Sequence, residues 1–487
     1  MPYRAKIIAK KIMEEHCLGI GIDKQRIKEL FDIAIHKDES LAKSGIDATF
    51  RAIVEPLNDS FDAADRDVYY EIFSYVIQLI REMPEAEHID ETLKTFGLFT
   101  QQDLLDRVRN LIAPGKKGPA QRHKVKKVFV LSRVTIGADV AITSIIIERS
   151  KKLFPKAQIL FLANRKNYEL FGDDEIIKIL PLDYKRRGSL ISRLESWLEA
   201  LENIKSETKD MESCEYVIID SNSRVTQLGL LPLVGEDAGY YLFEPLAHAD
   251  EETRKLGEDI NEWLNKVFGS AGKKSVYPTL SIPARYNETA KVFYQQLAKN
   301  KEFTVTVNFG AGENDNKRIS DEFEFEVVLH LIEKGAKVIL DEGFGNEEIE
   351  RANRIIDQLK KRSKTIMKVN EDLSFSAESN PDLIVYRGGI GQFAALISQS
   401  QFYVGYDSMG QHVAAALGIP ELVIFNGYPT EKFSRKWHPY GNGKIKIIHA
   451  EGKREKDVLE ITKRILSGCL FGAGIVLSIA WLIGINI

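Results

Sequence analysis

The segment between residues 402 and 425 carries the clearest sign of chemistry, because an apolar run, a polar turn and an alanine-rich segment ending at Gly418 follow one another. Asp407 and Ser408 are residue types that begin helices. The N–H groups at a helix start are unpaired and lie at the positive end of the dipole, so they stabilise an anion. The segment predicts a phosphate site ringed by Asp407, Ser408 and His412. A histidine on an alanine-rich helix also suits a packed interior position.

A second loop, residues 308–318, is small and polar and ends in two cations. Small residues at Asn308 and Gly310 let a ligand approach the backbone. Lys317 supplies a point charge, and Arg318 supplies a planar fork that fits phosphate oxygens. The Gly-Lys-Ser/Thr ending of a Walker loop is absent, which excludes an ATPase of that kind.

Acidic residues follow two other apolar runs. Asp139 lies in the loop 131–143, where a carboxylate either complements a helix start or acts as a general base. Glu347 and Glu348 lie at the end of the segment 341–348, where they either begin an exposed helix or accept hydrogen bonds from ribose hydroxyls. Both interpretations stay open for each loop.

These loops each follow a predicted strand. From Val125 onward, short apolar runs alternate with helical segments, which is typical of parallel sheets with crossover helices. The predicted strands are 128–131, 159–163, 177–180 and 216–220, and then 303–309, 337–340, 383–386, 402–405 and 422–425. Two such sheets in tandem predict a ligand cleft at the carboxyl ends of their strands.

The chain divides by pattern into five parts. Residues 1–112 have apolar residues at helical spacing and predict a separate helical domain. The others are a linker rich in proline, glycine and cations at 113–124, a first Rossmann-like domain at 125–275, a second Rossmann-like domain at 283–466, and an apolar tail at 467–487. The fold class is therefore α/β, with two tandem Rossmann-like domains after an all-helical domain. The cations of the linker suit an exposed hinge or, alternatively, a binding patch.

Composition narrows the function classes. The 487 residues are 44% apolar and 28% charged, and the net charge is −4, so no domain-wide excess of cations indicates a nucleic-acid partner. The three cysteines, Cys17, Cys214 and Cys469, are isolated, which argues against a disulfide framework and fits a reducing cytoplasm. No second His or Cys lies at ligand spacing from His412, so we expect no metal site.

The tail has no charged residue from Gly468 to Ile487, a length that can cross a membrane. Lys463 and Arg464 precede it and would keep the body of the protein on the cytoplasmic side. We therefore expect a cytoplasmic protein that this tail can attach to the inner face of the cell membrane. A terminal helix or strand docked on the fold is the alternative.

Residues 125–465 resemble glycosyltransferase family 9, the heptosyltransferase-like group with the GT-B fold. The resemblance rests on the Arg-containing loop 133–144, on Phe154-Pro-Lys-Ala157, on the pair Lys317-Arg318, and on the closing motif Asp407-Ser-Met-Gly-Gln-His-Val-Ala-Ala-Ala-Leu-Gly-Ile-Pro420. The sequence departs from the family where Met409 replaces a glycine and where Asn426-Gly-Tyr-Pro429 replaces Gly-Pro-Thr.

The resemblance implies an inverting, metal-independent and cofactor-free transfer of a sugar from a nucleoside-diphosphate sugar to a saccharide or protein hydroxyl. It implies that residues 125–275 form the acceptor-side domain and residues 283–466 the nucleotide-sugar donor domain. It also implies that Asp139 is the base and that Lys317 and the helix start at 408–412 stabilise the departing diphosphate. The donor-binding residues that we expect are Asn308, Gly310, Lys317, Arg318, Glu347, Glu348, Asp407, Ser408, Met409, Gly410 and His412. The alternatives are a sugar-nucleotide epimerase or hydrolase, and a catalytically inactive binding scaffold.

Overall fold

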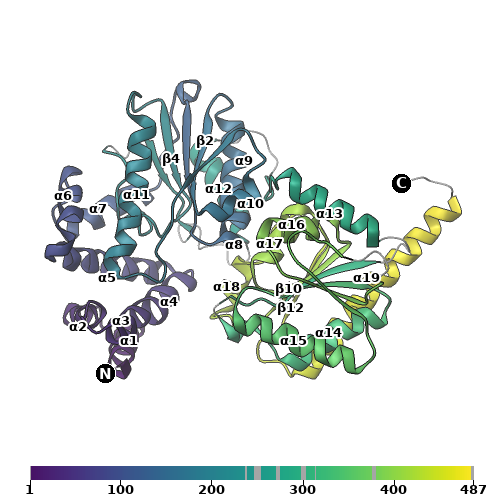
Figure 1. The fold of residues 1–487 in the computed structure, drawn as a ribbon. Helices are drawn as coiled ribbons and strands as arrows, with labels where there is room; N and C mark the ends of the chain where they lie inside the picture. The colour runs from purple at the N-terminus through teal and green to yellow at the C-terminus, as the bar shows by residue number, and fades with distance from the viewer. Residues whose placement is uncertain are drawn as a thin grey trace. The chain divides into compact units, whose positions relative to one another are not determined.

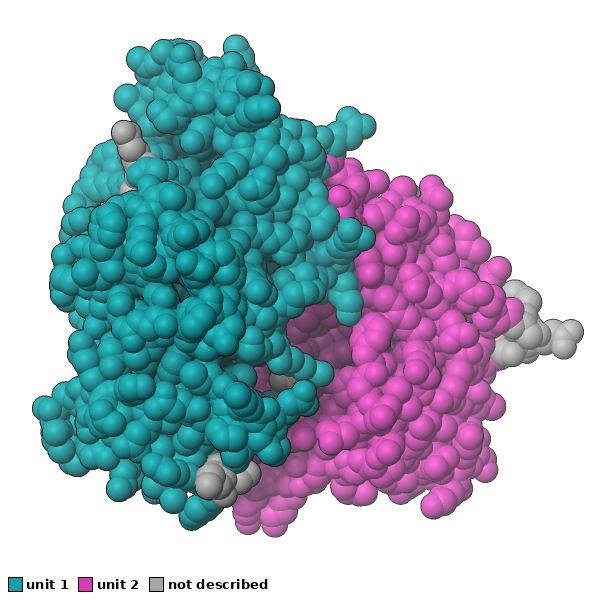
Figure 2. Space-filling view, turned by 60° about the vertical axis from the view of Figure 1, so that its left-hand side comes forward, with its two compact units in different colours: residues 1–167, 175–276, 429–437 teal, residues 168–174, 277–428, 438–487 magenta. Residues whose placement is uncertain are grey.

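The computed structural model describes residues 2–235, 239–245, 254–269, 275–297, 303–312, 314–375 and 380–483, with no description of the side chains of Pro2 and residues 470–483. The chain forms two compact units (Figure 2). Unit 1 comprises residues 1–167, 175–276 and 429–437, and unit 2 comprises residues 168–174, 277–428 and 438–487. The domain boundaries that we predict from the sequence remain predictions.

The first part of unit 1 is helical, as its periodicity predicts (Figure 1). Its helices are α1 (Pro2–Cys17), α2 (Lys24–Ala34), α3 (Glu39–Thr49), α4 (Glu55–Asp59), α5 (Ala63–Arg81), α6 (Glu87–Thr95) and α7 (Gln101–Ile112). Side chains of Asp23, Asp38, Asp62 and Thr100 cap helix starts, which satisfies N–H groups that have no partner within the helix. The apolar side chains of this helical region share one continuous core with the first sheet.

The first sheet is entirely parallel and has the order β3-β2-β1-β4-β5 among the described residues. Its strands are β1 (Lys127–Leu131), β2 (Gln158–Ala163), β3 (Ile177–Pro181), β4 (Tyr216–Asp220) and β5 (Tyr240–Leu242). Successive side chains of a strand point to opposite faces, so Phe129 and Leu131 join the core that includes α11 (Leu190–Thr208). Helices α9 (Ser144–Leu153) and α12 (Leu256–Phe268) cover the other face (Figure 1).

The second sheet, in unit 2, is also parallel and has the order β12-β11-β10-β6-β7-β9-β8. Its strands are β6 (Thr304–Asn308), β7 (Lys337–Asp341), β8 (Ile366–Val369), β9 (Leu383–Tyr386), β10 (Phe402–Tyr406), β11 (Glu421–Phe425) and β12 (Ile445–His449). Its helices are α10 (Tyr168–Phe171), α13 (Ala284–Leu297), α14 (Asp321–Glu333), α15 (Asn346–Lys361), α16 (Ile390–Gln399), α17 (Met409–Leu417) and α19 (Glu455–Ile483). The predicted fold class is confirmed, and every predicted strand is present.

Each sheet has a point where the strand order reverses. In the first sheet β1 pairs with both β2 and β4, and in the second β6 pairs with both β7 and β10. The loops that leave neighbouring strands on opposite sides of such a point open a crevice at the carboxyl edge of the sheet, where α/β proteins bind ligands. The loops after β1 and β4, and those after β6 and β10, are therefore the places to look for a site.

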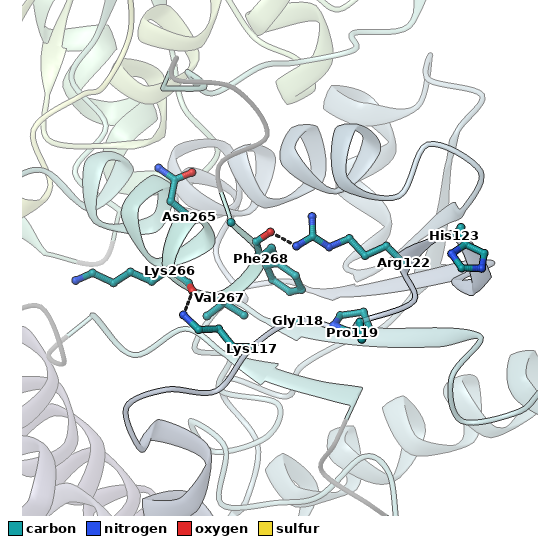
Figure 3. Close-up of a pocket in the computed structure, with 11 residues that line it drawn as sticks. Lys117, Gly118, Pro119, Arg122, His123, Asn265, Lys266, Val267 and Phe268 are labelled. Carbon is teal, nitrogen blue, oxygen red and sulfur yellow. Dashed lines mark hydrogen bonds between the residues drawn. The ribbon is translucent and has the colours of Figure 1, made fainter.

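The predicted linker runs along the end of α12. Gly118 N donates to Val267 O at 2.8 Å, Lys117 Nζ donates to Lys266 O at 3.0 Å, and Arg122 donates to Phe268 O (Figure 3). These contacts border an open groove of about 530 Å³. Arg122 leads into the amino end of β1, so the groove lies at the edge of the sheet opposite to the crevice. Lys117 and Arg122 thus donate hydrogen bonds to carbonyl groups at the end of α12 that have no partner within the helix.

The apolar tail continues α19, which runs from Glu455 to Ile483. Within the described residues, no helix is both long enough and apolar enough for a membrane span. The side chains of the tail beyond Cys469, and residues 484–487 altogether, lie outside the described residues.

Candidate functional site

The carboxyl ends of β6, β7 and β10 bring three polar side chains together in unit 2. Asn308, the last residue of β6, donates through Nδ2 to Asp341 Oδ2 at 2.6 Å. Its Oδ1 accepts a hydrogen bond from Gly310 N at 3.0 Å and lies 3.3 Å from Ser408 Oγ, which donates to it. Asn308 thus joins the loops on both sides of the reversal point. The sequence motifs predict Asn308 and Ser408 as site residues, but not Asp341.

Lys317 and Asp407 form an ion pair at the same edge. Lys317 Nζ lies 2.6 Å from Asp407 Oδ2 and 3.1 Å from the main-chain oxygen of Asp407. The side chain of Asp407 is only 9% exposed, and its other carboxylate oxygen accepts a hydrogen bond from Gln411 Nε2 at 2.6 Å. The lysine is therefore held at the start of α17 before any ligand binds.

The start of α17 itself is open to an anion. Ser408 is the N-cap residue, yet its side chain makes no capping hydrogen bond to the N–H groups of this helix. The N–H groups of its first turn, which begins at Met409, are therefore not satisfied by the cap. Gly410 is required by packing, because a Cβ at this position would meet the hydroxyl of Tyr403. The predicted helix start, and its predicted end at Gly418 in the left-handed conformation, are both present.

His412 lies in this first turn but is buried. Burial lowers its pKa to about 4, a shift that the negative charge of Asp407 opposes and the positive charge of Lys317 reinforces. The ring is therefore neutral at neutral pH. His412 can contribute a hydrogen bond to a ligand but not a positive charge.

Arg318 and Glu347 are not among these contacts, whereas Glu348 lines one small pocket together with Asn308, Gly310 and Asp341. Arg318 Nε donates to Glu324 Oε1 at 2.9 Å, and Arg318 Nη2 donates to Asp321 Oδ1 at 2.6 Å, so its guanidinium holds the start of α14. Glu348 Oε2 accepts hydrogen bonds from Phe344 N at 3.0 Å and from Gly345 N, and so stabilises the start of α15. Glu347 is exposed. Their roles in donor binding remain predictions.

The loop after β11 supports Lys317 from the side. Asn426 Nδ2 donates to Asn316 O at 2.9 Å and to Arg318 O at 2.7 Å, on either side of the lysine. Gly427 has φ +59°, and a Cβ there would meet Asn316 O. Asn426 and Gly427, two of the residues by which the sequence departs from the family motif, therefore fix the backbone that carries the lysine.

Asp139, in unit 1, lies at the reversal point of the first sheet. It begins a single π-helical turn, Asp139–Thr143, between α8 (Ile136–Ala138) and α9, a distortion that is frequent at functional sites. Its Oδ1 accepts from Arg133 N at 2.8 Å and from Thr143 Oγ1 at 2.9 Å. Its Oδ2 accepts from Ser132 Oγ at 2.6 Å and from Asn167 Nδ2 at 3.4 Å.

Burial raises the pKa of Asp139 to about 6, although the hydrogen bonds from Ser132, Arg133 and Thr143 act in the opposite direction. A carboxylate with a pKa near the working pH suits a general base, because it is ionised yet still binds a proton readily. The sequence predicts Asp139 as a site residue, but its partners Ser132, Thr143 and Asn167 belong to no motif of their own.

Comparison with known proteins gives a family for the second half of the chain. Residues 272–464 match the model of glycosyltransferase family 9 (heptosyltransferase). No curated protein sequence matches the chain. The predicted family resemblance is thereby confirmed for this region, and for residues 125–271 it remains a prediction.

Several solved structures are similar at low sequence identity. A glycosyltransferase family 9 protein from Veillonella parvula is 16% identical, with 70% of this chain and 89% of that chain covered and a TM-score of 0.49. The ADP-heptose heptosyltransferase II of E. coli is 16% identical, with 72% and 99% covered and a TM-score of 0.47. E. coli heptosyltransferase WaaC with ADP-2-deoxy-2-fluoro heptose is 18% identical, with 70% and 98% covered and a TM-score of 0.44.

Proposed function

Because residues 272–464 belong to glycosyltransferase family 9, we propose that the chain transfers a sugar from a nucleoside-diphosphate sugar to a hydroxyl group with inversion at the anomeric carbon. The chain is a glycosyltransferase. The observation that carries the donor assignment is the start of α17, where the side chain of the N-cap residue Ser408 makes no capping hydrogen bond and Asp407 holds Lys317.

The diphosphate would lie against the first turn of α17. The N–H groups there and the ammonium of Lys317 are donors already in place, and they would stabilise the negative charge that develops as the bond between sugar and diphosphate breaks. These groups supply positive charge from the protein itself, so we propose a metal-independent transfer. His412, being neutral, would donate a hydrogen bond.

Asp139 would take the proton of the acceptor hydroxyl while the oxygen of that hydroxyl attacks the anomeric carbon. The attack comes from the face opposite to the diphosphate, so the new bond to the acceptor forms as the bond to the diphosphate breaks. Of the four hydrogen bonds to Asp139, the one from Asn167, at 3.4 Å, is the longest and the easiest to exchange for an acceptor hydroxyl.

The test begins with a screen of ADP-, UDP- and GDP-sugars for protection against thermal unfolding, because a ligand that binds only the native state raises its stability. The donor found is then incubated with and without glycan, lipid-linked saccharide and peptide acceptors, in EDTA. We expect release of the nucleoside diphosphate to depend on acceptor and to survive the chelator. Asp139→Asn should keep the thermal protection and lose transfer roughly 100-fold or more.

Two outcomes would replace the proposal. Rapid conversion of the donor without any acceptor would indicate the epimerase or hydrolase. A chain that none of the nucleotide sugars protects would be the inactive scaffold. Full transfer by Asp139→Asn would show that another group is the base.

A further inference from the structure

The loop that follows β4 lies beside the loop that carries Asp139 and has an unusual backbone. Three of its residues other than glycine have positive φ, namely Asn222 at +71°, Gln227 at +49° and Leu228 at +57°. A residue other than glycine in this conformation is less stable than in a right-handed one. The side chain of Gln227 is fully buried, and neither of its amide atoms has a hydrogen-bond partner in the described part of the chain. Contacts from elsewhere must hold this loop in shape.

The helical region provides two of these contacts. Tyr70, on α5, donates its hydroxyl to Leu228 O at 3.1 Å and to Glu244 Oε2 at 2.9 Å. Arg107, on α7, donates to Gly229 O. Both side chains are buried, where a hydrogen bond that is lost leaves its partner without water. The helical region is thus joined to the loop at adjacent carbonyl groups, Leu228 and Gly229.

Arg107 also secures the strand next to this loop. Its guanidinium lies over the ring of Tyr240, 5.1 Å from the centroid. Tyr240 in turn donates its hydroxyl to Asp220, whose two carboxylate oxygens also accept from Ser223 N at 2.7 Å and from Thr226 Oγ1 at 2.5 Å. Arg107 therefore contacts Tyr240, which follows the loop, and through Tyr240 it supports Asp220, which precedes the loop.

Other residues of the same loop form hydrogen bonds with the chain that leaves β1. Ser221 Oγ donates to Leu131 O at 2.7 Å, and Ser223 Oγ donates to Ser132 O at 2.6 Å. In return, Arg133 Nη1 donates to Ser221 O at 3.1 Å. The loop after β4 therefore fixes the main-chain carbonyl groups of Leu131 and Ser132 and holds the side chain of Arg133.

Two of those three residues hold Asp139. Ser132 donates its hydroxyl to Oδ2 of the aspartate, and Arg133 donates its main-chain N–H to Oδ1. A displacement of residues 131–133 therefore changes both the orientation of the carboxylate and the hydrogen bonds that oppose the rise of its pKa.

We propose that the helical region positions Asp139, through Tyr70 and Arg107 acting on the loop after β4. Tyr70 and Arg107 are positioning residues, since neither touches the carboxylate. The inference rests on the proposed role of Asp139 as the base. It assigns residues 2–112 a role in activating the acceptor, because they would hold the base in position.

The test uses the full chain with Tyr70→Phe, Arg107→Met and the milder Arg107→Lys. The matched controls are Tyr75→Phe on α5, whose ring contacts Lys24, and Arg109→Met on α7, which pairs with Asp106 at 3.2 Å. We expect Tyr70→Phe and Arg107→Met to lower the kcat for transfer about tenfold and to shift the acidic limb of its pH profile, with the donor Kd unchanged within twofold. The controls should keep the wild-type kcat and pH profile.

Hydrogen–deuterium exchange separates this inference from the proposed function. Amides of residues 131–139 should exchange faster in Arg107→Met than in the wild type or in Arg109→Met. If Asp139→Asn retains transfer, the base assignment fails, but the exchange result still decides whether the helical region orders this segment. Unchanged exchange, or a kcat that stays at the wild-type value in folded Tyr70→Phe and Arg107→Lys, would overturn the inference.

Discussion

Lys317 Nζ lies 2.6 Å from Asp407 Oδ2, so a cation from the loop after β6 is fixed at the helix start that follows β10. The two residues come from opposite sides of the point where the strand order of the second sheet reverses. The pair orients the ammonium and neutralises a carboxylate that would otherwise repel a diphosphate. The same contact therefore serves the fold and would prepare the proposed anion site.

Replacing Lys317 should separate these roles. In Lys317→Met the charge is lost and Asp407 remains at the helix start, so we expect donor affinity to fall roughly 100-fold. Titration calorimetry with the donor measures the loss. Lys361→Met, an exposed position at the end of α15, is the control. The double variant Lys317→Met with Asp407→Asn should recover part of the affinity, because the repelling charge is gone. No recovery would mean that the ammonium acts on the ligand alone.

The glycine after Asn426 should matter for the same site. Gly427→Ala places a methyl group against Asn316 O at a backbone angle that alanine rarely adopts, so the segment carrying Lys317 must shift. Gly312, at φ +62°, has nothing within 4 Å of an added Cβ and provides the matched control. We expect Gly427→Ala to weaken donor binding at least tenfold, and Gly312→Ala to have only the smaller effect of its backbone strain. If both variants lose the same donor affinity, the contact with Asn316 O is not the cause of the loss.

The sequence predicts strands and helix starts well because these depend on local pattern. Ser408 is the N-cap of α17 and Gly418 is its C-cap in the left-handed conformation, as expected, because the backbone conformation at a helix end depends on the residues at that end. β5, β8 and β12 were missed. β5 has three residues, and the other two are edge strands interrupted by a lysine, as in Ile366-Met-Lys-Val369 and Ile445-Lys-Ile-Ile-His449.

The pairing of side chains could not be predicted in the same way. Lys317 and Arg318 are adjacent and chemically alike, yet Lys317 pairs with Asp407 across the sheet, whereas Arg318 pairs with Asp321 and Glu324 nearby. The direction that each side chain takes depends on the packing of α14 and α17, which no local pattern contains. Likewise, nothing in the sequence around Tyr70 indicates that it reaches a loop more than 150 positions away.

The pH dependence of transfer should reveal the state of Asp139. Since its pKa is raised to about 6, the rate should fall as the pH drops through about 6, where the base becomes protonated. Burial raises the pKa of Asp341 to about 6 as well, so Asp341→Asn is the necessary control and should retain the acidic limb. If the acidic limb disappears in Asp341→Asn, the group that titrates is Asp341 and not Asp139.

The stability of the chain should depend on the same carboxyl group in the opposite sense. Between about pH 4 and pH 6 the native state keeps a proton on Asp139 that the unfolded chain has already lost, so stability falls as the pH rises through this window. Asp139→Asn removes this contribution. We therefore expect the difference in thermal midpoint between the variant and the wild type to move in favour of the variant from pH 4 to pH 7. A difference that stays constant would indicate that Asp139 is not desolvated in solution.

The groove beside the linker should contribute to stability and not to transfer. Arg122 donates to Phe268 O, and Lys117 donates to Lys266 O, so both complete the carbonyl end of α12 (Figure 3). Loss of such a cap costs about 1 kcal/mol, so Arg122→Ala should lower the thermal midpoint by a few degrees and leave kcat unchanged. Lys266→Ala, which removes only an exposed pair with Glu262, should change neither quantity. A tenfold loss of transfer in Arg122→Ala, at an unchanged midpoint, would instead make the groove part of the substrate-binding surface.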